Sequence, residues 1–248
     1  MFKGSRLKVD WAKRHISELE ITLQAFFDAK PYRFVVEVDT DPEYFGLVIR
    51  GQQELPDSVS LLIGDAIHNL RVALDRLAVE LVTMKAPASK GVKFPFCADA
   101  GSLEKTIKKR RIDRAGPDVV NRIRGLKPYK GGNNPLRGLH DLDIADKHER
   151  PIITVAVAGW ENINRFVRES GNIILGSAIV DIKDGVKFLK FPADGRAKLD
   201  EQFDISTKII FDDGFAFERR DVIPTLHQLA SMVEDIINDF EAIIRKRI

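Results

Sequence analysis

The sequence predicts an α+β fold in which helices pack on an antiparallel sheet and a long helix lies near each end of the chain. Three segments carry apolar residues every three or four positions, which is the spacing of one helical face: residues 4–29, 58–85 and 224–246. Residues 33–51 alternate apolar and polar residues, as strands do. From residue 152 the chain is β-rich, with the same alternation over residues 179–191 and 208–218. We expect a single domain with three parts in order: helix-rich 1–150, β-rich 151–219 and a C-terminal helix over 220–248.

Local signals mark the ends of the elements in the first half. The first helix should stop before Pro31, because the residue before a proline disfavours helical dihedrals. Asp and Pro at residues 39–42 favour a turn between two strands. Asp57 is a candidate N-cap for the second helix. Pro135 suits the first turn of a further helix that runs over residues 136–150.

The second half carries two turn signals and then a long amphipathic helix. Asp184-Gly185 and Asp213-Gly214 each stand between alternating runs, which is typical of two-residue hairpins. The last helix has one apolar stripe: Leu226, Leu229, Val233, Ile236, Phe240 and Ile243. An acid near its start, Asp221, and basic residues near its end suit the helix dipole.

Composition places the chain among folded globular proteins. With 248 residues, 44% of them apolar and 31% charged, it can bury a sizeable core. Cys97 has no second cysteine to pair with, and no apolar run reaches the length of about 18 residues typical of a membrane span. The segment MFKGSRLKVDWAKRH lacks the apolar run of a signal peptide, so we expect a cytoplasmic protein without membrane association. Nucleotide-binding glycine motifs, GxSxG and paired zinc cysteines are absent, which leaves any cofactor unknown.

The net charge of +2 conceals a strongly basic segment over residues 105–130. Ten basic residues stand there against two acids, Asp113 and Asp118, so the local charge is +8. The ten are Lys105, Lys108, Lys109, Arg110, Arg111, Arg114, Arg122, Arg124, Lys127 and Lys130. They are candidate contacts to RNA, DNA or another polyphosphate, because such a field attracts phosphate groups. The alternative is a solvated surface whose cations pair with acids elsewhere in the fold.

The helix over residues 58–85 combines a core face with a polar group on its other side. The core face holds Val59, Ile63, Ala66, Ile67, Leu70, Leu74, Leu77 and Leu81. Nearly opposite lie His68, Arg71 and Asp75, within a second apolar strip. Partly desolvated polar groups need partners, and Arg71 and Asp75 suit each other as an i,i+4 pair. The trio is therefore either a structural polar network or part of a ligand or catalytic site.

The helix over residues 136–150 contains the second polar group, in the stretch GLHDLDIADKHER. His140, Asp143 and Lys147 share one face of this helix, whereas His148 lies on another. The two histidines cannot bind one ion from a straight helix, because that geometry needs a spacing of four residues. A satisfied histidine–carboxylate network is the main structural interpretation.

A divalent metal ion is the alternative to that network. It would need a mixed nitrogen and oxygen set drawn from both helices, in which His140 and either Asp143 or Asp146 combine with Asp65 or His68. The spacing matches no metal motif, so we assign no metal ligand.

Four stretches, in this order and spacing, resemble a widespread group of uncharacterised bacterial and phage proteins: HNLRVALDRL at 68–77, FPF at 94–96, GLKPYKGG at 125–132 and LHDLDIADKH at 139–148. The resemblance covers roughly residues 60–155 and, more loosely, the final helix. It implies that the two polar helices pair with each other. It implies no reaction, because the group has no established activity.

A second resemblance concerns the start of the last helix. HEPN ribonucleases carry Arg, a polar residue and then His within one helix, and Arg220-Asp221 with His227 is similar. Pro224 places a helix start between these residues, which departs from that setting.

Three functions remain open from the sequence. The first is binding of nucleic acid or polyphosphate through residues 105–130, with phosphodiesterase or nuclease activity at a shared cleft lined by His68, Arg71, Asp75, His140, Asp143, Lys147 and His148. A histidine would act there as general acid or base, and Arg71 or Lys147 would stabilise the phosphorane charge. The second is a non-enzymatic scaffold protein, homodimeric through its terminal helices. The third is a small-molecule hydrolase that uses the same polar residues.

Overall fold

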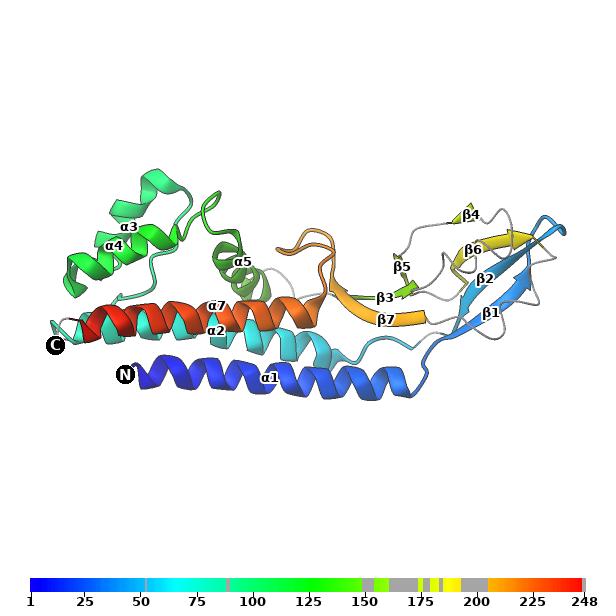
Figure 1. Ribbon diagram of the computed structural model, residues 1–248, viewed down its shortest axis with the longest axis horizontal. Helices are drawn as coiled ribbons and strands as arrows, with labels where there is room; N and C mark the ends of the chain where they lie inside the picture. Colours follow the sequence, from blue (N-terminus) through cyan, green and yellow to red (C-terminus); the bar gives the residue numbers. More distant parts are fainter. Residues whose placement is uncertain are drawn as a thin grey trace.

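Three long helices lie side by side and form the main body of the structure (Figure 1). They are α1 (Lys3–Asp28), α2 (Asp57–Thr83) and α7 (Val222–Arg245). The computed structural model describes residues 1–51, 53–87, 90–148, 154–160, 174–175, 179–182, 185–192 and 205–246. Each of the three helices contacts the other two, so helix-on-helix packing closes this body.

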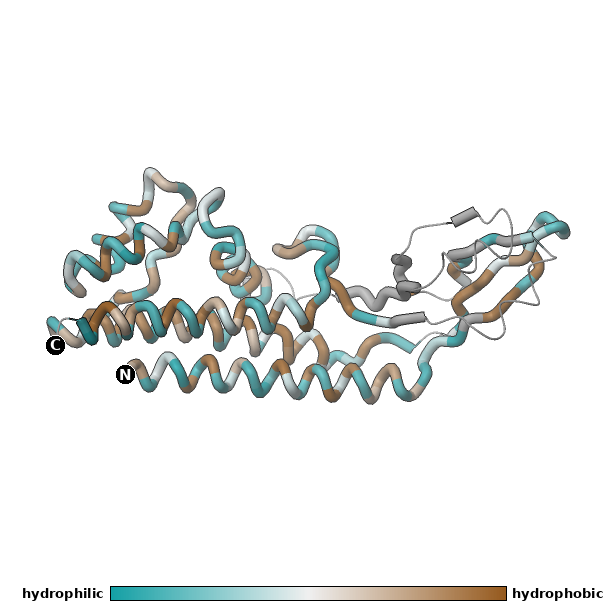
Figure 2. The backbone as a smooth tube through the Cα atoms, viewed as in Figure 1, coloured by the Kyte–Doolittle hydropathy of each residue, from teal (hydrophilic) through white to brown (hydrophobic). Residues whose placement is uncertain are grey.

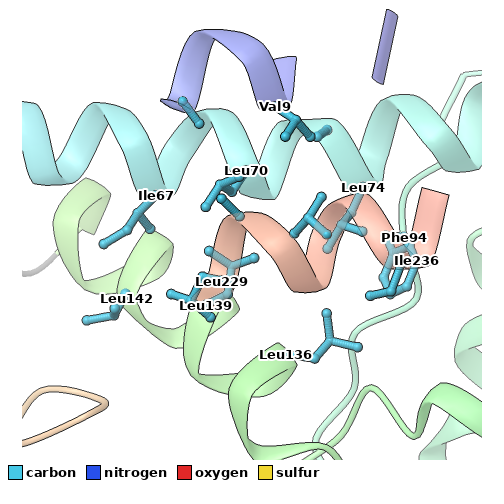
Figure 3. Packing of buried hydrophobic residues seen from close by; sticks show 14 of the residues in the cluster. Val9, Ile67, Leu70, Leu74, Phe94, Leu136, Leu139, Leu142, Leu229 and Ile236 are labelled. Carbon is cyan, nitrogen blue, oxygen red and sulfur yellow. The ribbon is translucent and has the colours of Figure 1, made fainter. Parts of the chain in front are cut away.

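Apolar periodicity explains why these helices pack as they do. Apolar and polar residues alternate along all three, as Figure 2 shows. Helices α1 and α7 each bury one stripe, whereas α2 is buried around most of its circumference. Every residue predicted for the core face of α2 lies in the interior. Figure 3 shows the centre of this core, where Leu70 and Leu74 of α2 lie near Leu229 of α7.

Three shorter helices form a second layer on this body: α3 (Leu103–Lys109), α4 (Pro117–Leu126) and α5 (Asn134–His148). Short 3-10 turns over Ala100–Ser102 and Ile112–Ala115 precede α3 and α4. Gly116 separates the second turn from α4 with a φ of 98°, a left-handed value that favours glycine. Leu136, Leu139 and Leu142 fasten α5 to the core (Figure 3).

The strands lie beyond one end of the helical body and pair antiparallel (Figure 1). One sheet has the order β1-β2-β6-β4: Arg33–Val38, Tyr44–Arg50, Lys187–Pro192 and Ile174–Leu175. The other has the order β5-β3-β7: Ile179–Asp181, Thr154–Trp160 and Ile205–Phe211. The predicted α+β class, with a long helix near each end of the chain, is confirmed.

Both predicted hairpins of the second half are wrong in detail. β5 pairs with β3, and β6 pairs with β2 and β4, so the strands beside Asp184-Gly185 belong to different sheets. After β7 the chain does reverse, but over a longer loop. The Arg219 N–H donates to the Phe211 carbonyl at 2.9 Å, and helix α7 begins at once afterwards. Local turn residues set where a chain bends, and distant partners decide which strands pair.

The start of α2 differs from the prediction by one residue. Pro56 occupies the N-cap position of α2 and Asp57 is its first helical residue, so the predicted Asp57 cap is wrong by one position. None of the helices in the described ranges combines the length and apolar content that a bilayer crossing requires.

Candidate functional site

The two polar helices pack against each other, and their polar residues meet at the contact between α2 and α5. His68, Arg71 and Asp75 of α2 recur at three and four residues, so they project from one side of the helix. His140 and Asp143 of α5 are three residues apart and face them. We call these five residues the α2–α5 cluster.

His68 and Asp143 form the first link across the cluster. His68 Nδ1 lies 3.0 Å from Asp143 Oδ1. Asp143 is buried, with a side chain 8% exposed, whereas the His68 side chain is 42% exposed. An ionised carboxylate can only accept a hydrogen bond, so His68 donates from Nδ1 in this pair, and within the described residues nothing bonds to its Nε2.

Arg71 and His140 form the second link. Arg71 Nε donates to His140 Nδ1 at 3.2 Å, and Arg71 Nη1 lies 2.7 Å from Asp75 Oδ1. The ring of Phe96 stacks on His140 with centroids 4.4 Å apart, and the Arg71 guanidinium lies 4.5 Å from the same ring. Arg71 is therefore buried between Asp75, His140 and Phe96. It can position these residues, but its guanidinium is not accessible to a ligand that arrives from solvent.

Asp75 fixes the segment that supplies Phe96. The Phe94 N–H donates to Asp75 Oδ1 at 2.8 Å, while the Phe94 ring packs in the core. The same carboxylate therefore anchors both Arg71 and the backbone of the FPF segment.

His140 is held neutral by its surroundings. Burial lowers its pKa from the usual 6.5 to about 4, with further lowering by the charges of Arg71 and Arg137. Because Arg71 Nε can only donate, His140 Nδ1 accepts and its proton sits on Nε2. The two histidines of the cluster thus differ at Nδ1: His68 donates there to Asp143, and His140 accepts there from Arg71.

Backbone contacts connect the cluster to the basic segment. The Cys97 N–H donates to the Pro128 carbonyl at 3.2 Å, and the Lys130 N–H donates to the Ala98 carbonyl at 3.2 Å. On the other side, Arg137 Nη1 of α5 donates to the Cys97 carbonyl at 2.8 Å. The loop that carries Lys127 and Lys130 is thereby fixed next to the residues that hold His140.

Cys97 itself shows no sign of reactivity. The residue is buried, and burial raises the pKa of its thiol. Its Sγ donates to the Asp99 carbonyl at 3.3 Å. It behaves as the small buried residue that its position beside Phe96 predicts.

The basic segment holds two arginines in salt bridges and eight other cations. Arg122 pairs with Asp239 of α7, and Arg124 Nε lies 2.6 Å from Glu104 Oε1, which lowers the pKa of that carboxyl. These two arginines agree with the alternative prediction, in which cations of this segment pair with acids elsewhere in the fold. The others lie exposed on α3 or in the loops beside α3 and α4, with Arg110 half-buried: Lys105, Lys108, Lys109, Arg110, Arg111, Arg114, Lys127 and Lys130.

Two predicted site residues cannot be placed by their side chains. Lys147 and His148 end α5, and their side chains lie outside the described residues. The HEPN-like pair is separated: Arg220 precedes α7, and His227 Nε2 pairs with Glu20 Oε1 of α1 at 2.9 Å. Within the described ranges, no three His, Cys, Asp or Glu side chains gather as metal ligands would.

Phe96 and Arg137 belong to the site although the sequence analysis did not predict them as site residues. Phe96 forms the stacking platform for His140 and Arg71, and the FPF motif was its signal. Arg137 pairs with Asp141 at 2.7 Å and reaches the Cys97 carbonyl. Its i,i+4 spacing to Asp141 was visible, but its second contact spans 40 residues of chain.

Two described hollows lie away from the α2–α5 cluster. One, of about 470 Å³, is lined by α1, β7 and the start of α7, with Leu23, Phe27 and Ile223 among its walls. The other, of about 540 Å³, lies between α4 and α7 beside Arg122 and Asp239. Neither includes a residue of the cluster, so neither hollow supports a small-molecule hydrolase built on those residues.

Comparisons with protein-family models, with curated proteins and with solved structures find no match to this chain. What the molecule does must therefore be inferred from the α2–α5 cluster and the basic surface next to it.

Proposed function

We propose that this protein binds RNA or DNA through the exposed cations of α3 and its neighbouring loops. The observation that carries the proposal is the group of lysines on α3. Lys105, Lys108 and Lys109 are all exposed, and within the described chain none of them forms a salt bridge. Lysines at i, i+3 and i+4 repel one another, and a polyphosphate would relieve that repulsion.

The surrounding charges extend this surface. Arg111 lies two residues beyond the end of α3 with a left-handed φ of 61°, and its side chain is exposed. Lys127 and Lys130 are exposed in the loop between α4 and α5. A nucleic-acid backbone carries a regular row of phosphates. A surface with several separated cations can contact several of these phosphates at once, so it suits a nucleic acid better than it suits a single small anion.

Hydrolysis of the bound phosphodiester is a second candidate, favoured by the His68–Asp143 pair. Asp143 orients His68, whose exposed ring leaves Nε2 open to accept a proton from water or from a ribose hydroxyl. The basic loop is linked to the same cluster through Cys97 and Arg137. Arg71 is buried and paired, so the role of stabilising the phosphorane charge passes to the exposed cations.

The binding test is a salt series with labelled single- and double-stranded RNA and DNA. We compare the natural chain with Lys108→Gln/Lys109→Gln, and the matched control is Arg122→Gln/Arg124→Gln, in which the lost cations are already ion-paired. The lysine variant should bind more weakly and lower the log–log salt slope by about 1.4–1.8, the value for two phosphate contacts. The control should keep most of its slope. Absence of binding at low salt, or equal losses in both variants, overturns the proposal.

The cleavage test uses the same gels. His68→Gln should abolish any fragments while leaving affinity unchanged, because His68 lies outside the basic surface. Fragments that persist in this variant would exclude His68 as the base. Binding with no fragments in the natural chain would leave a binding protein and reject the hydrolytic candidate.

A further inference from the structure

The outer face of α1 carries apolar residues that the helical body leaves uncovered. Leu7 is 56% exposed, Trp11 48% and Ile21 70%. With the exposed residues Arg14, Glu18 and Ala25 they recur at alternating spacings of four and three, which places all six within a stripe about 80° wide. We call these six residues the outer stripe.

The outer stripe lies opposite the buried face of α1. That face holds Val9, Ala12 and Ile16, and it packs against α2 and α7. Figure 1 shows α1 along one edge of the helical body. The exposed positions of α7, in contrast, are mostly polar, for example His227, Gln228 and Asp235, with Pro224 and Ala242 as the exceptions. Among the terminal helices, α1 therefore presents the apolar surface that needs a partner.

The order of residues in the outer stripe is self-complementary about residue 16. If a second copy of α1 runs antiparallel across the stripe, Arg14 faces Glu18 of the second copy, and Glu18 faces its Arg14. On either side of this central polar layer, Trp11 meets Ile21 and Leu7 meets Ala25. A parallel pairing would instead place Arg14 against Arg14 and Glu18 against Glu18, which is repulsive.

Charges on the flank of the stripe agree with the same register. Lys3 and Asp28 are both exposed and lie on the same side of the stripe at opposite ends of α1. In an antiparallel pair related by a two-fold axis, equivalent flanks meet, so Lys3 comes next to Asp28 of the second copy. Neither Arg14 nor Glu18 has an ion pair inside the described chain, and Arg14 instead lies 5.3 Å from the Trp11 ring.

We infer that the outer stripe of α1 is a homodimer interface in which two copies of the helix pack antiparallel with residue 16 at the two-fold axis. Trp11 and Ile21 supply the apolar contact, and the two Arg14–Glu18 pairs set direction and register. One helix from each subunit buries an area at the low end for specific interfaces, so the dimer should dissociate on dilution. The inference is independent of nucleic-acid binding, since α1 carries none of the residues of the basic surface.

Charge reversal tests the interface by sedimentation velocity across a concentration series. Arg14→Glu and Glu18→Arg should each shift the chain toward monomer, because each places like charges opposite one another. The double variant Arg14→Glu/Glu18→Arg restores opposite charges at both pairs and should recover the dimer. Lys109→Glu, the same kind of reversal at an exposed helical position of α3, should dimerise like the natural chain.

Cross-linking tests the register directly, in a Cys97→Ser background. Leu7→Cys/Ala25→Cys should form an oxidised dimer, whereas Leu7→Cys alone should not. A natural chain that stays monomeric throughout, single reversals that leave its mass unchanged, or a double variant that remains monomeric would each overturn the inference. Circular dichroism melts check folding, and equal melting temperatures assign any loss of dimer to the interface.

Discussion

His68 Nδ1 and Asp143 Oδ1 lie 3.0 Å apart and join α2 to α5 across 75 residues of chain. Asp143→Ala should lower the free energy of unfolding by about 1–3 kcal/mol, because it leaves a half-buried histidine without its acceptor. Urea titration measures the change. The control is Asp141→Ala, which removes a more exposed carboxylate on the same helix and should cost under about 1 kcal/mol. Equal costs at the two positions would mean that the link between the helices contributes nothing.

Even the conservative replacement of Arg71 by lysine should lower the stability of the protein. Arg71→Lys keeps the charge but loses the Nε donor to His140 and the flat guanidinium over Phe96. We expect a loss of about 2 kcal/mol of unfolding free energy, within the range for a broken buried polar network. Arg76→Lys, an exposed neighbour on α2, should change stability by no more than about 0.5 kcal/mol. A melting temperature unchanged by Arg71→Lys would contradict the positioning role.

The half-buried His140 should make the fold sensitive to acid. Its pKa is about 4 in the folded chain against the usual 6.5, so the unfolded chain binds a proton that the folded chain rejects. The stabilisation is complete above about pH 6.5 and is lost progressively as the pH falls toward 4. His140→Asn keeps an acceptor for Arg71 and cannot titrate in this range.

The comparison between the natural chain and His140→Asn isolates this effect from other titrating groups. The two pH values to compare are 7.5 and 4.5, which span most of the range over which the stabilisation is lost. The melting temperature of the natural chain should fall further between them than that of the variant. Parallel losses would show that His140 does not couple folding to protonation.

Gly138 is required by its contact with Phe217. A Cβ at Gly138 would lie 2.6 Å from Cζ of the Phe217 ring, so the ring or helix α5 would have to move. Gly138→Ala should destabilise the protein by about 1–3 kcal/mol although alanine is the better helix former. The control is Gly125→Ala in α4, where the nearest atom is 3.6 Å away and the change should be neutral or stabilising by up to about 1 kcal/mol. A stabilised Gly138→Ala variant would rule out the close approach.

The helices and their buried faces could be predicted from the sequence because helical contacts are local. The core face predicted for α2 is buried at every position, and the stripe of α7 is buried from Leu226 to Phe240. The same periodicity placed His68, Arg71 and Asp75 together, and the Arg71–Asp75 pair follows from i,i+4 spacing alone. Three and four residues along a helix always share a side, whatever the rest of the fold does.

The partners of these residues required the tertiary structure. Nothing in the local pattern indicates that His68 meets Asp143, that Arg71 meets His140, or that Phe96 lies against both His140 and Arg71. The strand partners were likewise beyond reach, since β2 pairs with β6 across more than a hundred residues. Such contacts depend on how distant segments are brought together, and turn residues constrain only the nearest pairing.

Charge and hydropathy follow from the sequence, whereas ion pairing and burial follow from the tertiary structure. The sequence by itself determined that residues 105–130 are basic and that α1 is amphipathic. The tertiary structure decided that Arg122 and Arg124 are neutralised by Asp239 and Glu104, and that the outer stripe of α1 stays uncovered. The physical reason is that charge and hydropathy are properties of single residues, whereas pairing and burial depend on what the fold places within a few ångströms.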